Sequence, residues 1–125
     1  MGADVTLITY GTLIDEVLSA AELLSQHGVE ATVLRLLTLE PLPVYHILTM
    51  MSDTPHVVTV EEVAGGCGIR EDLAWKLRHL NSEIRTDGID LGHNYITHGD
   101  MRSLYHHYGL DAASIAAYVQ EVRQS

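Results

Sequence analysis

The sequence has a single cysteine, Cys67, and a single lysine, Lys76, and no apolar run approaches the roughly 20 residues that a membrane-spanning helix needs. One cysteine cannot form an internal disulfide or a cysteine-based zinc finger, and it fits a reducing compartment. The amino terminus also lacks a basic start followed by an apolar segment. We therefore expect a cytoplasmic protein with no membrane partner.

Positive charge is scarce, with 7 Lys+Arg against 17 Asp+Glu, and the formal net charge is −10. The arginines are scattered along the chain, so the surface would repel a phosphate backbone and nucleic acid is not an expected partner. A hydrophobic fraction of 46% is enough for a globular core, and 125 residues fit one domain.

Strand-like runs alternate with helical patterns along the chain. Apolar and β-branched runs predict strands at residues 5–10, 31–36, 56–60 and 89–91. Apolar residues at helical spacing predict helices at residues 13–24, 44–51, 69–80, 101–108 and 112–122. Strands joined through helices pair in parallel, because a parallel neighbour needs a connection that runs back along the sheet. We expect a three-layer α/β/α domain with a mainly parallel sheet of four to five strands.

Three helix ends carry capping signals. Thr12 and Asp15 resemble a capping box at the start of the first helix, and Gly28 stands where a left-handed residue would end it. Asp111 is placed to cap the last helix.

A crevice is expected at the carboxyl ends of the strands. If the first strand lies between the second and third, the strand order is 2-1-3-4 and the crossover direction reverses there. This order would bring the turn at residues 10–12 beside the loop at residues 61–68. The candidate crevice or interface residues are Gly11, Thr12, Glu61, Glu62, Gly65, Gly66 and Gly68.

The segment Gly65-Gly66-Cys67-Gly68 precedes a helix, where backbone amides can approach an anion. It matches neither the GxGxxG pattern of dinucleotide sites nor the Walker pattern. Nearby carboxylates would also oppose a phosphate, and they belong to Glu61, Glu62, Glu71 and Asp72. A tight turn that lines an interface is therefore favoured over a phosphate site.

The densest group of potential metal ligands comprises His93, His98, Asp100, His106 and His107. Adjacent helical side chains point about 100° apart, and no known ligand spacing such as HExxH occurs. No catalytic triad or nucleophile elbow is recognisable either. The residues thus predict no catalytic, cofactor-binding or metal-binding side chain in this chain.

Trp75 lies roughly opposite the apolar stripe of its expected helix, beside charged residues. A large aromatic side chain in that position can anchor a partner. It can equally pack beneath a neighbouring loop, and the sequence leaves both interpretations open.

The order of segments resembles a known family. Three segments are similar to the carboxy-terminal domain shared by transketolases and the β chains of 2-oxoacid dehydrogenases. They are the segment from Val5 to Thr12, residues 36–43, and Val57-Val58-Thr59-Val60-Glu61-Glu62 before the glycine-rich loop. The tail, from Ile96-Thr97-His98-Gly99 to Gly109-Leu110-Asp111-Ala112, resembles the end of 1-deoxy-D-xylulose-5-phosphate synthases.

The resemblance implies a role within a larger thiamin-diphosphate enzyme. Such a synthase joins pyruvate and glyceraldehyde 3-phosphate with loss of CO2, for isoprenoid, thiamin and pyridoxal synthesis. Its cofactor is held through Mg2+ by a GDG…N motif in an earlier domain, and this chain contains no Gly-Asp-Gly. The resemblance implies that residues 3–125 are one domain of such a homodimeric enzyme, separated from its amino-terminal and middle domains, with Met1-Gly2 as an added start.

Two classes of function follow from this comparison. The first is an accessory domain that supports the dimer of the transferase. Such a domain would be inactive on its own and would bind no cofactor itself. The same domain of a transketolase or of a dehydrogenase β chain is an alternative within this class. The second is a self-standing regulatory or ligand-binding module that uses the crevice at Gly11, Thr12 and residues 65–68.

Overall fold

The computed structural model describes residues 4–37, 41–51, 54–61, 68–89 and 111–124. Its strands are β1 (Val5–Thr9), β2 (Ala31–Arg35), β3 (His56–Val60) and β4 (Arg85–Ile89). Its helices are the short 3-10 helix η1 (Gly11–Leu13), α1 (Ile14–Gln26), α2 (Val44–Met50), α3 (Arg70–Leu80) and α5 (Ala112–Arg123). The helix expected at residues 101–108 lies outside the described residues.

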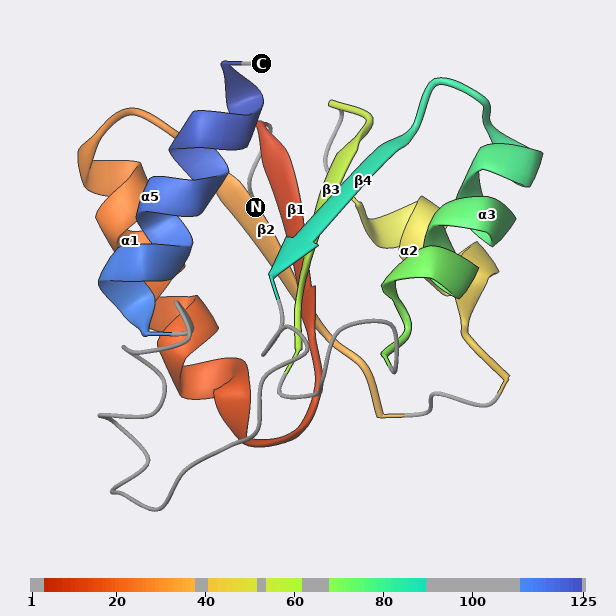
Figure 1. Cartoon of the computed structure of the whole chain (residues 1–125), viewed down its shortest axis with the longest axis horizontal. Coiled ribbons are helices and arrows are strands. Elements are labelled where there is room, and N and C mark those ends of the chain that lie inside the picture. The colour runs from red at the N-terminus through yellow and green to blue at the C-terminus, as the bar shows by residue number, and fades with distance from the viewer. Residues whose placement is uncertain (1–3, 38–40, 52–53, 62–67, 90–110, 125) are drawn as a thin grey trace.

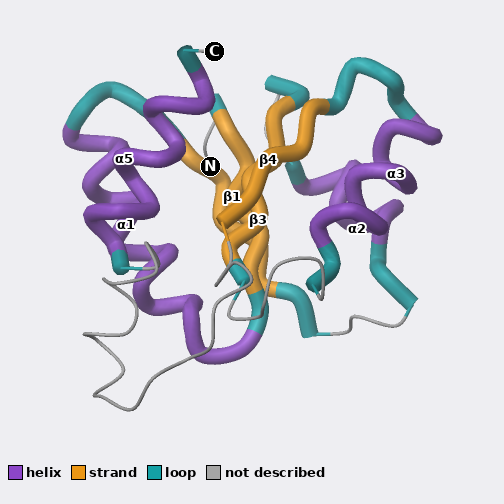
Figure 2. Tube along the Cα trace, in the orientation of Figure 1, coloured by secondary structure: helices purple, strands orange, loops and turns teal. Residues whose placement is uncertain are grey.

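The four strands form one parallel sheet in the order β2-β1-β3-β4. Helices α1 and α5 cover one face of this sheet, and α2 and α3 cover the other (Figure 1). Figure 2 shows the same three layers, with the strands between two groups of helices. The expected α/β/α fold and strand order are therefore confirmed.

The core consists of two apolar clusters separated by the sheet. Successive residues of a strand point to opposite faces, so Leu7 of β1 packs beneath α1 and α5 while Ile8 packs beneath α2 and α3. Strands β1 and β3 are buried on both faces and read as continuous apolar runs with threonines. The two central strands thereby fix where the carboxyl-end crevice lies.

Two of the expected helix ends are confirmed. Gly28 has a φ of 80°, which favours glycine, and it follows the last turn of α1. The amides of Gly28 and Val29 donate to the carbonyls of Ser25 at 3.1 Å and Leu24 at 2.9 Å, the bond pattern of a Schellman motif. At α5, the Asp111 side chain accepts a hydrogen bond from the Ser114 amide at 3.2 Å.

The start of α1 differs from the prediction. The turn η1 intervenes, so the capping position falls on Leu13, whose side chain makes no capping hydrogen bond. The expected capping box at Thr12 is therefore wrong as the start of this helix. A further correction applies at the end of α3. The spacing of Ile69, Leu73, Leu77 and Leu80 predicts one apolar stripe, but Leu80 is 40% exposed.

The fourth strand lies earlier than predicted, at Arg85–Ile89, and shares only Ile89 with the expected residues 89–91. Its sequence is polar, which conceals it from a search for apolar runs. Side chains help to hold it: the Asp87 carboxylate lies 2.8 Å from His56 Nε2 of β3 and 2.8 Å from Arg85 Nε. None of the helices in the described ranges is long and apolar enough to cross a membrane.

Candidate functional site: a closed crevice at the strand ends

Glu61 is the central residue of the crevice. It follows β3 directly, and only 2% of it is exposed. Its Oε1 accepts a hydrogen bond from the Ile69 amide at 2.6 Å and another from the Tyr10 hydroxyl at 3.0 Å. Because Tyr10 follows β1, the structure brings the ends of β1 and β3 together as the strand order predicted.

Gly68 makes room for this arrangement. A Cβ atom at Gly68 would overlap Oε1 of Glu61 and would lie 2.7 Å from its Oε2. Real Cβ atoms do not approach neighbours so closely, so the carboxylate occupies space that only a glycine leaves open. Gly68, before α3, therefore leaves room for the carboxylate of Glu61 in the same chain.

The electrostatics of the crevice favour that carboxylate over an external anion. Ile69 is the capping residue of α3, and the amino end of a helix carries partial positive charge. A hydrogen bond between a carboxylate and a backbone amide at this position is charge-assisted and favourable. Glu61 thus fills the place that a phosphate would need, and its charge would repel a second anion.

The other sequence candidates do not form a second cluster in the described residues. Gly11 has a φ of 71° and lies in η1 with Thr12, which is exposed. Glu62, Gly65 and Gly66 lie outside the described residues. The histidines considered as metal ligands, at positions 93, 98, 106 and 107, are outside them as well.

Trp75 is 67% exposed on α3, whereas Glu61 is buried. Its indole stacks on the imidazole of His79, with ring centroids 5.4 Å apart and an interplanar angle of 9°. Packing beneath a neighbouring loop is therefore not what the structure shows for this side chain.

Two partners of Glu61 were missed by sequence reasoning, the Tyr10 hydroxyl and the Ile69 amide. The sequence placed Glu61 at the crevice and predicted that its charge repels phosphate, but it did not indicate these two hydrogen-bond donors. A signal was present: a tyrosine and a glutamate each follow a buried strand, and those two strands were expected to be neighbours.

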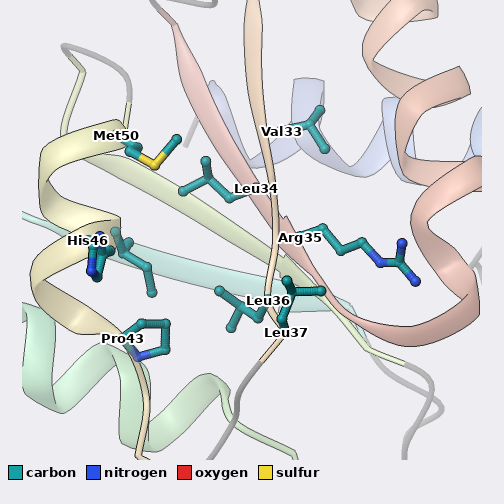
Figure 3. A pocket seen from close by; sticks show the side chains of 9 residues that line it. Val33, Leu34, Arg35, Leu36, Leu37, Pro43, His46 and Met50 are labelled. Carbon is teal, nitrogen blue, oxygen red and sulfur yellow. The ribbon is translucent and has the colours of Figure 1, made fainter.

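A hollow of about 390 Å³ lies elsewhere, between the end of β2 and α2. Figure 3 shows Leu34 of β2 and Leu36 just after it on the side that faces His46 and Met50 of α2, whereas the side chain of Arg35 extends away from α2. The wall of this hollow is mainly apolar, with Arg35 and His46 as its basic residues. In the part of the chain that is described, no three His, Cys, Asp or Glu side chains gather to hold a metal ion.

Comparison with known proteins decides the family. The family model described as "Transketolase, C-terminal domain" matches residues 1–115. The chain belongs to the transketolase C-terminal domain family. The match extends from β1 into α5, so this family membership covers both layers of helices and the closed crevice.

Two curated relatives of the domain are 1-deoxy-D-xylulose-5-phosphate synthases. The protein of Chlorobium luteolum is 32% identical over 126 residues, and that of Chlorobaculum tepidum is 33% identical over 122 residues. Each alignment covers 96% of this chain and 19% of the relative. This transketolase C-terminal domain is therefore homologous to one part of a much longer enzyme.

A solved structure shows the same fold. It is described as "Split gene transketolase, inactive beta4 tetramer", with a TM-score of 0.81 and 24% identity, and the match covers 99% of this chain and 39% of that chain. The fold of the transketolase C-terminal domain is thereby confirmed.

Proposed function

We propose that this domain is the accessory carboxy-terminal domain of a 1-deoxy-D-xylulose-5-phosphate synthase. In this proposal it supports the dimer of that enzyme and braces its active site without contributing a reacting group. The homology to two such synthases over 96% of the chain supports the choice over a transketolase or a dehydrogenase β chain. The activity itself, the joining of pyruvate and glyceraldehyde 3-phosphate with loss of CO2, belongs to the whole enzyme.

One observation carries the accessory role: in the crevice where an α/β domain would hold a ligand, the Glu61 carboxylate already occupies the amide at the start of α3. The Glu61 carboxylate is buried, and it is bonded to the Ile69 amide and the Tyr10 hydroxyl. A ligand-binding module would instead leave such groups open to its ligand. The closed crevice therefore favours support over recognition of a small molecule.

The residues present do not fit thiamin diphosphate. A diphosphate placed at the amino end of α3 would compete with Glu61 for the Ile69 amide and would face a carboxylate. The sequence also contains no Gly-Asp-Gly that could hold the cofactor through Mg2+. We propose that cofactor and metal bind to other domains of the parent enzyme. Those domains are then the partners of this domain, and the enzyme acts in the cytoplasm.

A domain graft tests this function. Residues 4–124 would replace the homologous domain of the Chlorobaculum tepidum synthase, next to a truncated synthase without that domain. We expect the graft to form dimers and to make 1-deoxy-D-xylulose 5-phosphate, and the truncated enzyme to lose activity. A matched graft with Gly68→Ala should lose dimer and activity together, because the substitution displaces Glu61.

The isolated chain provides the opposite test. We expect no decarboxylation of pyruvate by the 125-residue chain with thiamin diphosphate and Mg2+ present. Turnover above a buffer control would contradict an accessory role. A graft that folds and dimerises but is no more active than the truncated enzyme would contradict it as well.

A further inference from the structure

The exposed face of α3 carries an aromatic side chain that the closed crevice does not use. Trp75 is 67% exposed, and a hollow of about 460 Å³ lies beside it. The hollow is lined by Trp75 itself with Ala74, Arg78, His79 and Ser82. A protruding indole and a recess therefore lie next to each other on one helix.

Charged side chains surround Trp75 in an ordered way. Glu71 and Asp72 lie in the first turn of α3, and Arg78 and His79 lie in its last turn. In the described ranges, neither the Glu71 carboxylate nor the Arg78 guanidinium forms a side-chain hydrogen bond or ion pair, and both residues are exposed. Arg70, the first residue of α3, is engaged with the Gly88 carbonyl. The other charged side chains of α3 are acidic before Trp75 and basic after it.

Helix geometry places these charges in matching positions. At 1.5 Å per residue, Glu71 lies about 6 Å before Trp75 and Arg78 about 4.5 Å after it. At 100° per residue, Glu71 and Arg78 lie about 40° and 60° to the same side of Trp75. Asp72 and His79 occupy the other side by the same arithmetic, at about 60° and 40°.

We propose that α3 is a self-association surface on which a second copy of this chain docks. The two α3 helices pack antiparallel around a twofold axis beside Trp75. Arg78 of each copy then faces Glu71 of the other, and His79 faces Asp72. Each indole enters the hollow beside the indole of the other copy.

Charge complementarity identifies a second copy as the occupant. A partner of one charge sign would meet like charge over half of this face, whereas a reversed copy meets opposite charge over both halves. A twofold axis requires such a self-complementary patch, and twofold dimers are the commonest oligomers. The Asp72 carboxylate lies 3.0 Å from Lys76 Nζ within the helix, so the Glu71–Arg78 pair carries most of the charge matching.

This proposal rests on the proposed function in one respect: it assigns the dimer support to a particular surface. The two can fail separately. The graft tests whether the domain sustains the enzyme, and the oligomeric state of the 125-residue chain tests α3 alone.

Sedimentation equilibrium of the 125-residue chain tests whether it dimerises. Trp75 is the only tryptophan of the sequence, so tryptophan fluorescence reports directly on the α3 surface. We expect a monomer-dimer equilibrium whose emission shifts to shorter wavelength as the dimer forms. Trp75→Ala should weaken the dimer by about 30-fold or more, as truncation of a central aromatic anchor does.

Charge reversal gives the sharper test. Glu71→Arg or Arg78→Glu alone places like charges opposite each other and should leave a monomer. The double variant Glu71→Arg/Arg78→Glu restores opposite charges across the axis and should dimerise again. Glu22→Arg makes the same charge change on the exposed face of α1 and should leave the dimer intact. Circular dichroism confirms that each variant folds.

Three results would overturn the proposal. A wild-type chain that stays monomeric at the highest attainable concentration is the first. A folded double variant that associates no better than the single variants is the second. The third is a dimer whose formation leaves the emission of Trp75 unchanged, because the contact would then lie elsewhere on the domain.

Discussion

The crevice at the strand ends and the outer face of α3 use similar side chains in opposite ways. In the crevice, Glu61 is buried and every partner it needs lies within the same chain. On α3, Trp75 and Arg78 are exposed, and we propose that this surface docks a second copy of the chain. In our proposals the conventional ligand position of this fold is structural, and recognition takes place on a helix face.

Substitution of Gly68 should affect the crevice most strongly. The added methyl group of Gly68→Ala would displace the Glu61 carboxylate and leave a buried charge without its partner, which should lower the free energy of unfolding by about 3 kcal/mol. Gly11→Ala is the matched control, because its positive φ is strained but no atom lies within 4 Å of the new Cβ. The control should cost about 1 kcal/mol. Equal losses in urea unfolding would mean that Glu61 is not held tightly.

Removal of the charge alone should have a smaller effect. Glu61→Gln keeps an oxygen that can accept from Ile69 and Tyr10, but it loses the charge assistance at the helix end. We expect a loss of about 1 to 2 kcal/mol by urea unfolding. A variant more stable than the wild type would contradict this prediction, because the buried carboxylate would then lower the free energy of unfolding.

Trp75→Ala should leave the stability of the monomer almost unchanged. An exposed side chain contributes little to folding, so the expected change is less than about 0.5 kcal/mol. The measurement is urea unfolding at a concentration low enough to keep the chain monomeric, followed by circular dichroism. A large loss would place Trp75 in the folding core and remove the contrast with Glu61.

The smallest expected effect on the free energy of unfolding comes from the partly buried hydroxyl of Tyr118 beside β4, and it is absent at neutral pH. Burial raises the pKa of Tyr118 above its ordinary value of about 10, and the Asp87 carboxylate adds to the shift. A backbone hydrogen bond with Gly88 and the charges of Arg70 and Arg85 oppose it. The folded chain therefore holds this proton more tightly than the unfolded chain does.

The sign of the pH dependence follows from this difference. The contribution of Tyr118 is fully present below pH about 10 and is lost as the pH rises above that value. Tyr118→Phe should lose less stability than the wild type between about pH 9 and pH 11 in urea unfolding. Parallel curves for the two proteins would contradict the raised pKa.

Much of the scaffold could be predicted from the sequence because its signals are local. The apolar strands β1 and β3, the left-handed Gly28 and the cap at Asp111 each depend on short-range rules. The strand order was expected on the condition that β1 lies between β2 and β3, and the structure meets that condition. Strand β4 could not be placed well, since its polar residues are held by contacts such as the one between Asp87 and His56. That contact joins residues far apart in the sequence.

The candidate site was predicted only in part for the same reason. The spacing placed Glu61 and the turn after β1 together, but it could not show that the carboxylate turns inward to the amide of Ile69. Distance in space, and the room left by Gly68, decide that outcome. The sequence therefore located the crevice but not whether it was open or closed.

Calorimetric titration of the isolated chain with thiamin diphosphate and Mg2+ is the most direct test of a crevice closed by Glu61. We predict no binding tighter than millimolar, because the carboxylate already occupies the amide at the start of α3. Micromolar binding of thiamin diphosphate by the wild-type chain would contradict this prediction.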